Sequence, residues 1–181
     1  MDATEELVEA LRDRLRLCGY GEQAAGDIDG VDCLAVLHTP ASARRTFACA
    51  VARVGDEVRD ADAAVAFVGR IRRGLAKRYA SFPWLKTVGT YNVLLCGHDL
   101  FERLGGHEGR LIDFGDLHVN VLLGVVLIDV ETFQARGDTT WGLLDAADQF
   151  KHIQAAADEW SRSCRRTRRL DRTTAQVLSV A

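Results

Sequence analysis

The chain is poor in several features that mark common protein classes. Its 181 residues include two prolines, one methionine, three lysines and only 7% aromatic residues. No apolar run reaches the roughly 18 residues that a membrane-spanning helix needs, so no membrane association is expected. The apolar fraction of 48% and the charged fraction of 27% are close to globular averages. The composition therefore argues against global disorder and predicts a soluble folded domain.

Paired cysteines are also missing. The five cysteines are spread singly, without a C-x-x-C pair, which favours free thiols in a reducing compartment. A closed zinc site usually shows paired ligand spacing. The first residues are acidic and polar rather than apolar, which is not the pattern of a secretory signal. We therefore expect a cytoplasmic location, and the sequence predicts no cofactor.

The chain lacks the common catalytic and nucleotide-binding motifs. It contains no G-x-G-x-x-G after an apolar run, no G-x-x-x-x-G-K-[ST], no G-x-S-x-G and no H-E-x-x-H. These absences disfavour dinucleotide oxidoreductases, P-loop NTPases, elbow-type serine hydrolases and simple zinc proteases.

Charge is unevenly distributed along the chain. The formal net charge is −3, but residues 63–86 and 161–181 carry +6 and +5, whereas residues 1–62 and 87–160 carry −6 and −8. Most of the basic residues are arginine, 20 against three lysines. A near-neutral total is unlike that of a dedicated nucleic-acid binder, whose domain is usually strongly basic.

Periodicity predicts the secondary structure. A capping-box pattern at Asp2 and Glu5 begins a helix over residues 2–18. Apolar runs over 31–38 and 46–54 predict an antiparallel hairpin. A long amphipathic helix follows over 61–81, with Pro83 after it, and then a strand over 87–96. The order strand, helix, strand predicts a parallel crossover.

The second half alternates in the same way. Residues 100–104 are expected to form a short helix, and the apolar run 117–130 forms one long strand or two strands meeting at Gly124, where a bulge is expected. Asp138, Thr139 and Thr140 are expected to cap a final helix over 141–164.

Together these elements predict an α/β fold, on the border with α+β. Its order is α-β-β-α-β-α-β(β)-α, with helices packed on a mixed β-sheet of about four to five strands. Residues 1–164 form one globular domain. Residues 165–181 form a basic C-terminal tail, whose order the sequence leaves open.

The first candidate site is Cys96-Gly97-His98-Asp99, directly after a predicted strand. Ligands in open α/β sheets favour the carboxyl ends of strands. A thiol near a helix start could act as a nucleophile. The alternative is that Cys96 is a core residue and that His98 or Asp99 only caps the next helix, which already accounts for each residue type.

The second candidate is Asp113 and Asp116 with His118. Two carboxylates and an imidazole are suitable ligands for a hydrolytic metal ion. The alternative is a loop aspartate pair followed by the polar face of a half-exposed strand. The catalytic candidates are therefore His98, Asp99, Asp116 and His118, and the metal-ligating candidates are Asp113, Asp116 and His118.

Two further patterns involve charged residues. Asp129 and Glu131 end the long apolar run, where nuclease-like folds place acids, but Phe133 stands where such folds need a lysine. We therefore expect these acids only to mark the point where the strand leaves the core. The basic positions could bind phosphates, although no aromatic residues are interleaved as a stacking platform requires. The anion-binding candidates are Arg70, Arg73, Lys77, Arg165, Arg166, Arg168 and Arg169.

Three function classes follow. The first is a non-catalytic binding or assembly module that acts through a protein partner or as a homo-oligomer, for example a homodimer. The second is a small hydrolase, with or without a metal ion, built around His98, Asp99, Asp116 and His118. The third is a binder of nucleic acid or another polyanion through the basic positions. The architecture alone does not choose among them.

Overall fold

Seven strands of the computed structural model form one mixed sheet. The structure describes residues 2–23, 25–40, 45–79, 87–112, 120–139 and 146–180. The strand order is β1-β3-β4-β5-β6-β7, and β2 also pairs with β3. Strands β4, β5 and β6 are parallel, whereas β3 and β7 are antiparallel to their neighbours. The strands are β1 (Gly21–Gln23), β2 (Gly26–Ile28), β3 (Val31–His38), β4 (Arg45–Arg53), β5 (Thr87–Cys96), β6 (Asn120–Asp129) and β7 (Ala135–Thr139).

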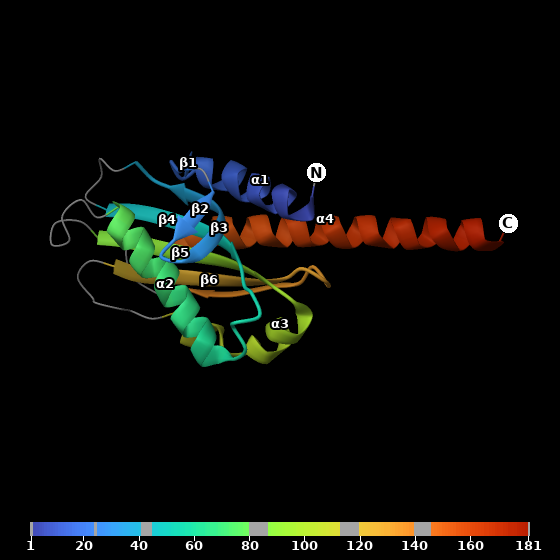
Figure 1. Ribbon diagram of the computed structural model, residues 1–181. Helices are drawn as coiled ribbons and strands as arrows, with labels where there is room; N and C mark the ends of the chain where they lie inside the picture. The colour runs from blue at the N-terminus through green and yellow to red at the C-terminus, as the bar shows by residue number, and fades with distance from the viewer. Residues whose placement is uncertain are drawn as a thin grey trace.

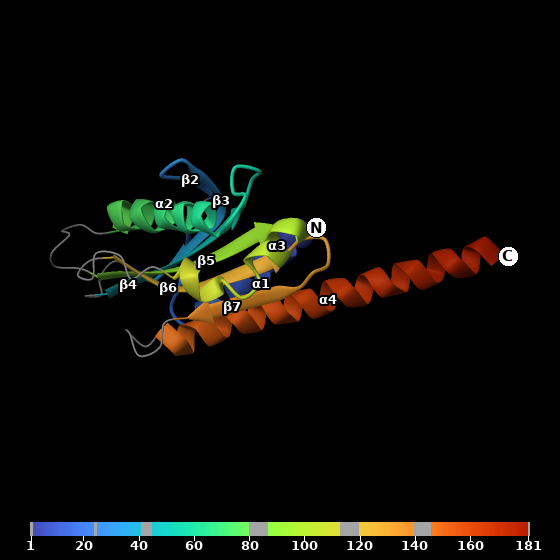
Figure 2. The same ribbon diagram turned by 90° about the horizontal axis from the view of Figure 1, so that it is seen from below.

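Helices cover both faces of the sheet. One face carries α2 and α3, and the other carries α1 and α4 (Figures 1 and 2). The helices are α1 (Ala3–Arg16), α2 (Ala61–Tyr79), α3 (His98–Leu104), a short 3-10 helix (Glu108–Leu111) and α4 (Ala146–Val180). None of the helices in the described part of the chain is both long and apolar enough to cross a lipid bilayer.

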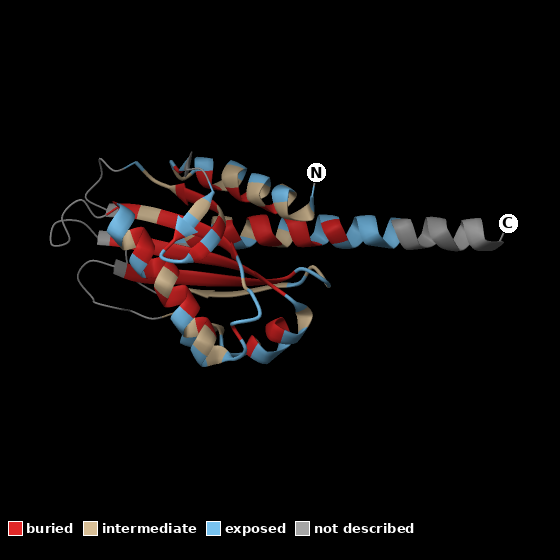
Figure 3. Cartoon of the chain, viewed as in Figure 1, coloured by how far each residue is buried: buried red, intermediate tan, exposed pale blue. Residues whose placement is uncertain are grey.

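Alternation along the strands divides the core into two clusters. In β4, Ala48 and Ala50 pack in the cluster beneath α2, whereas Cys49 and Val51 pack with α1 and α4. Successive strand residues point to opposite faces, so one strand supplies both clusters. Buried residues accordingly run through the middle of the sheet (Figure 3). All five cysteines are free.

The predicted α/β fold is confirmed, with more strands than expected. The helix over 61–81, the hairpin of 31–38 with 46–54 and the parallel crossover to 87–96 all form. The capping box of Asp2 and Glu5 is present at the start of α1. The additional strands β1, β2 and β7 are short, between three and five residues.

The expected helix cap at residues 138–140 is wrong. Asp138 and Thr139 belong to β7, and α4 begins at Ala146. All five residues of β7 are half-buried. Its sequence also does not alternate between apolar and polar residues, which is the pattern that identifies a strand. Its conformation comes from pairing with β6 rather than from its own composition.

The bulge expected in the long apolar strand is present. The register of β5 against β6 shifts between Thr90 and Tyr91, which pair with Leu122 and Gly124, so the bulge lies at Leu123. A side chain at residue 124 would approach the Phe150 ring of α4 to within 2.6 Å. Glycine at this position therefore lets α4 lie close to the sheet.

Helix α4 is longer than the predicted final helix. It has 35 residues and includes residues 165–180 of the expected C-terminal tail. Its end leaves the domain on the side where α3 and the N-terminus lie (Figure 1). Residues 165–170 are all exposed.

Candidate functional site

The carboxyl ends of the three parallel strands lie side by side at one edge of the sheet. Strand β4 ends at Arg53, which is in register with Leu95 of β5, and Cys96 is in register with Asp129 of β6. This edge is where ligands bind in open α/β sheets. It is also the edge from which α4 extends (Figure 1).

Asp129 is a fully buried carboxylate at this edge. Its Oδ1 accepts hydrogen bonds from the backbone N–H groups of Glu131 and Thr132, at 2.8 and 3.2 Å. Its Oδ2 accepts a hydrogen bond from the Thr132 hydroxyl. The side chain thereby closes the tight turn between β6 and β7, in which Phe133 has a φ of 57°. Aspartate favours such turns because its short side chain reaches nearby backbone N–H groups.

His98 pairs with this carboxylate from the neighbouring strand. It is the first residue of α3, directly after the cap residue Gly97. Its Nδ1 lies 2.8 Å from Asp129 Oδ2, and its backbone N–H donates to Glu131 Oε1 at 3.1 Å. The imidazole remains 43% exposed.

Each member of the pair shifts the other's protonation. The hydrogen bond to Asp129 raises the pKa of His98 above its ordinary value, and the negative charges of Asp129, Glu102 and Glu131 act in the same direction, while desolvation opposes them. Burial raises the pKa of Asp129, but the hydrogen bonds from Thr132, His98 and the turn backbone outweigh burial and lower it overall. The pair is therefore held as a carboxylate beside a readily protonated imidazole.

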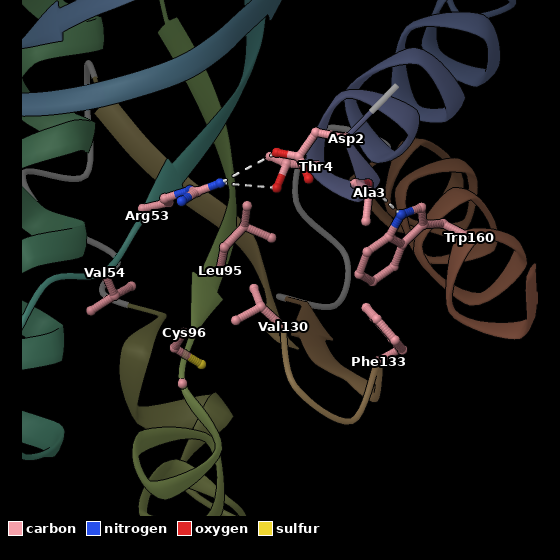
Figure 4. A pocket seen from close by; sticks show the side chains of 11 residues that line it. Asp2, Ala3, Thr4, Arg53, Val54, Leu95, Cys96, Val130, Phe133 and Trp160 are labelled. Atoms are coloured by element: carbon pink, nitrogen blue, oxygen red, sulfur yellow. Dashed lines mark hydrogen bonds and ion pairs between the residues drawn. The ribbon is translucent and has the colours of Figure 1, made fainter. Parts of the chain in front are cut away.

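Two cavities share Val54 and Gly97 in their linings. The polar cavity has a volume of about 280 Å³ and contains His98, Asp99 and Glu131 together with Asp56, Arg59 and Arg103. The apolar cavity, about 350 Å³, lies between the start of α1, the ends of β4 and β5, the β6–β7 turn and α4 (Figure 4). Its wall includes Val54, Leu95, Val130, Phe133 and Trp160, with Arg53 on one side.

The arrangement of His98 and Asp129 resembles the orienting half of a general-base site. A carboxylate on Nδ1 fixes the ring and leaves Nε2 to exchange a proton. No family model, curated protein or solved structure matches this chain. Function is therefore inferred from the geometry of its own residues.

In the first sequence candidate, His98 and Asp99 lie at a cavity whereas Cys96 lies in the core. His98 and Asp99 both line the polar cavity. Cys96 is a core residue, 2% exposed, and burial raises the pKa of its thiol to about 12, with the charge of Asp129 adding to the effect. Its Sγ lies 3.6 Å from the Ile128 carbonyl oxygen. A protonated, buried thiol is a poor nucleophile, so the core interpretation of Cys96 holds.

The second candidate lies outside the described residues. Asp113, Asp116 and His118 fall within residues 113–119, and their roles as ligands or catalysts stay predictions. Within the described ranges, no group of three or more His, Cys, Asp or Glu side chains is placed to hold a metal ion.

Asp129 is the residue that sequence reasoning undervalued. We expected Asp129 and Glu131 only to mark the end of a strand, yet both contact His98. The signal in the sequence was that Asp129 ends one predicted strand and that His98 follows the end of another. The adjacency of these two strands becomes visible only in the sheet order.

The anion-binding candidates lie on two separate surfaces. Arg70, Arg73 and Lys77 belong to α2 on one face of the sheet, whereas the arginines of 165–169 belong to α4 on the other (Figure 2). Lys77 already forms an ion pair with Asp29 at 2.8 Å.

The second group, on α4, lines a concavity of the surface. A concavity of about 450 Å³ is lined by Arg162, Arg165, Arg166 and Arg169. Arg168 points elsewhere, because it donates to the Glu131 carbonyl oxygen and lies 5.9 Å from the centre of the Phe133 ring.

Proposed function

We propose that the protein is an assembly module that associates with a second copy of itself through the arginine face of α4, formed by Arg162, Arg165, Arg166 and Arg169. The observation that carries the proposal is that these four exposed side chains line one concavity on α4. The C-terminal part of this helix extends away from the sheet (Figures 1 and 3).

The spacing of the four arginines creates a concentrated positive surface. Residues three and four apart are neighbours on a helix, so positions 162, 165, 166 and 169 share one face. Arg162, Arg165 and Arg166 form no ion pair with a carboxylate in the described parts of the chain. Like charges at this spacing destabilise a helix, and an anionic partner would remove that cost.

Charge complementarity favours the chain itself as the partner. Residues 161–181 carry a net charge of +5, while the preceding 160 residues carry −8. The C-terminal segment of one copy and the rest of another copy therefore carry opposite net charges. A nucleic-acid duplex would bring its own negative charge close to that acidic domain, which makes it the less favoured occupant.

Light scattering at tens of micromolar protein tests this proposal. We expect a dimeric or larger mass at low salt that falls toward the monomer at high salt, because exposed charges are screened. Charge reversal in Arg162→Glu/Arg166→Glu should give a monomer at both salt concentrations. The matched control, Arg70→Glu/Arg73→Glu on α2, should still assemble.

A monomeric mass of the wild-type protein at low salt would overturn self-association. Fluorescence anisotropy with a labelled DNA duplex separates the polyanion alternative. Salt-sensitive binding that Arg162→Glu/Arg166→Glu abolishes, together with a monomeric wild type, would assign the arginine face to nucleic acid instead.

Hydrolysis is a second candidate function, favoured by the hydrogen bond between His98 and Asp129 at the polar cavity. In this proposal His98 Nε2 takes a proton from water, and the resulting hydroxide adds to an ester carbonyl. When the intermediate collapses, the proton passes from His98 to the departing alkoxide. Asp129 holds the ring and balances the charge on the imidazolium.

A panel of activated esters tests this second candidate. General-base catalysis contributes about 10²–10⁴-fold to rate, so His98→Gln should lower kcat/KM by about 100-fold or more. His152→Gln, on α4, is the control and should retain activity. Equal rates for wild type and His98→Gln would exclude a catalytic role for His98 on these substrates.

A further inference from the structure

We propose that the apolar cavity of Figure 4 is a binding site for a small organic acid, in which Arg53 binds the carboxylate and the apolar wall holds an aromatic or aliphatic body. The site is separate from the arginine face of α4, and its occupation does not depend on self-association.

The cavity combines an apolar wall with a polar rim that Arg53 forms together with Asp2 and Thr4. Arg53 lies on one side, at the end of β4, while Leu95, Val130, Phe133 and Trp160 lie around the remaining space (Figure 4). Small-molecule sites are typically concave and mostly apolar, with a few placed polar groups, and have volumes from about 300 Å³ upward. At about 350 Å³ the cavity fits a compact ligand of one or two rings.

The aromatic wall is rigidly held. The Phe133 and Trp160 rings meet edge to face at a centroid distance of 5.6 Å. The Trp160 indole N–H donates to the Ala3 carbonyl oxygen at 2.6 Å, and the Ser161 hydroxyl donates to the Phe133 carbonyl oxygen. Because the indole of Trp160 is anchored by its N–H and the Phe133 ring packs against it, a ligand would have little ordering of the wall to do, which reduces the entropic cost of binding.

Arg53 is placed to bind an anion. Its Nη2 donates to the Thr4 hydroxyl at 3.1 Å and lies 3.7 Å from an oxygen of Asp2. Guanidinium has five N–H donors, and the donors on Nη1 and Nε make no hydrogen bond with any described residue. These donors can form charge-assisted hydrogen bonds with a ligand carboxylate while Nη2 keeps its contacts with Thr4 and Asp2.

The chemistry of the wall selects against other ligands of this size. A neutral ligand would leave the Nη1 and Nε donors of Arg53 unused, and a cationic ligand would find the carboxylate of Asp2 already paired with Arg53. A strongly polar ligand would cover Leu95 and Val130 without satisfying its own hydrogen-bonding groups. An acid with an apolar body satisfies both parts of the cavity.

Isothermal titration calorimetry with matched probes tests the proposal. The probes are 2-naphthoate, which carries the carboxylate, and 2-naphthamide, which has the same ring system without the charge. We expect saturable binding of naphthoate, and at least about tenfold weaker binding of naphthamide, because charge-assisted hydrogen bonds are the stronger ones.

Two substitutions locate the bound probe. Arg53→Gln should weaken naphthoate binding by about tenfold or more and leave naphthamide binding unchanged. Arg16→Gln is the matched control, since both arginine side chains are 62% exposed, and it should change neither. Val130→Phe should block both probes by filling the cavity, and Val130 tolerates the change because it is 42% exposed.

Three outcomes would overturn the inference. These are no saturable naphthoate binding to the wild-type protein, equal affinity for the two probes, and naphthoate binding that persists unchanged in Arg53→Gln. Thermal unfolding of each variant confirms that it is folded before titration. Self-association is measured separately by light scattering, so a negative result for ligand binding does not affect the test of assembly, and the reverse also holds.

Discussion

At the residue scale, one buried carboxylate organises the candidate site. Asp129 closes the β6–β7 turn and at the same time receives His98 from the next strand. A buried charge is costly unless hydrogen bonds satisfy it, and here the turn backbone, a threonine hydroxyl and an imidazole do so. The same side chain therefore serves both the stability of the turn and the protonation of the histidine.

Removing the charge of Asp129 should lower the pKa of His98. The wild-type pKa is raised above 6.5, chiefly by the hydrogen bond to Asp129, so Asp129→Asn should bring it down toward that value. The measurement is a pH titration of the His98 ring resonances by NMR, with His152 as an internal reference. An unchanged His98 titration in Asp129→Asn would show that Asp129 does not control the imidazole.

The same pair predicts a pH dependence of stability. Because the pKa of His98 is higher in the folded state than in the unfolded state, its stabilising contribution is complete below the unfolded pKa. It is lost as the pH rises through the folded pKa. The difference in free energy of unfolding between wild type and His98→Gln should therefore shrink across that range. Urea denaturation at a series of pH values measures this difference, and a constant difference would contradict the prediction.

At the element scale, strands with strong apolar character form where their composition indicates, and weaker ones depend on neighbours. Strands β3 and β5 match the expected ranges 31–38 and 87–96. Strand β7 reads as a polar segment and forms because β6 offers it an edge. Strand β6 in turn requires the bulge at Leu123 to bring Gly124 under α4.

Gly124→Ala should destabilise the protein. An added Cβ would lie 2.6 Å from the Phe150 ring and 3.2 Å from the Asp138 carbonyl oxygen. Overpacking of this kind costs about 1–3 kcal/mol. Chemical denaturation measures the change in the free energy of unfolding.

Two variants control this prediction. Gly26→Ala, where an added Cβ meets nothing within 4 Å, should change the free energy of unfolding by less than about 0.5 kcal/mol. Shortening the opposing ring in Gly124→Ala/Phe150→Leu should recover part of the loss beyond the sum of the single changes. Strict additivity would place the cause elsewhere.

At the scale of the whole molecule, α4 has two different roles along its length. Its first half packs on the sheet through Phe150, Ile153 and Trp160, while residues 165–170 are exposed. Most helical stability in proteins comes from packing one face. Residues 165–170 therefore gain little from packing on the domain, which is consistent with their proposed use in assembly.

Truncation after Cys164 should separate folding from assembly. The removed segment contributes the Arg168 contacts to Glu131 and Phe133, and exposed contacts of this kind are worth about 1 kcal/mol or less. We expect the thermal midpoint to change by a few degrees at most, while light scattering shows loss of assembly. A truncated protein that unfolds at room temperature would show that the removed segment stabilises the domain.

The sequence by itself determined the α/β class, the long helix α2, the hairpin of β3 with β4 and the bulge near Gly124, because these depend on local periodicity, turn residues and apolar runs. It also placed His98 at the end of a strand. Only the tertiary structure decided that Asp129, 31 residues away, bonds to His98. It also decided that four arginines of α4 share one concavity and that Arg53 and Trp160 line one cavity. The physical reason is that strand neighbours and helix docking are set by long-range pairing and packing, which local patterns do not encode.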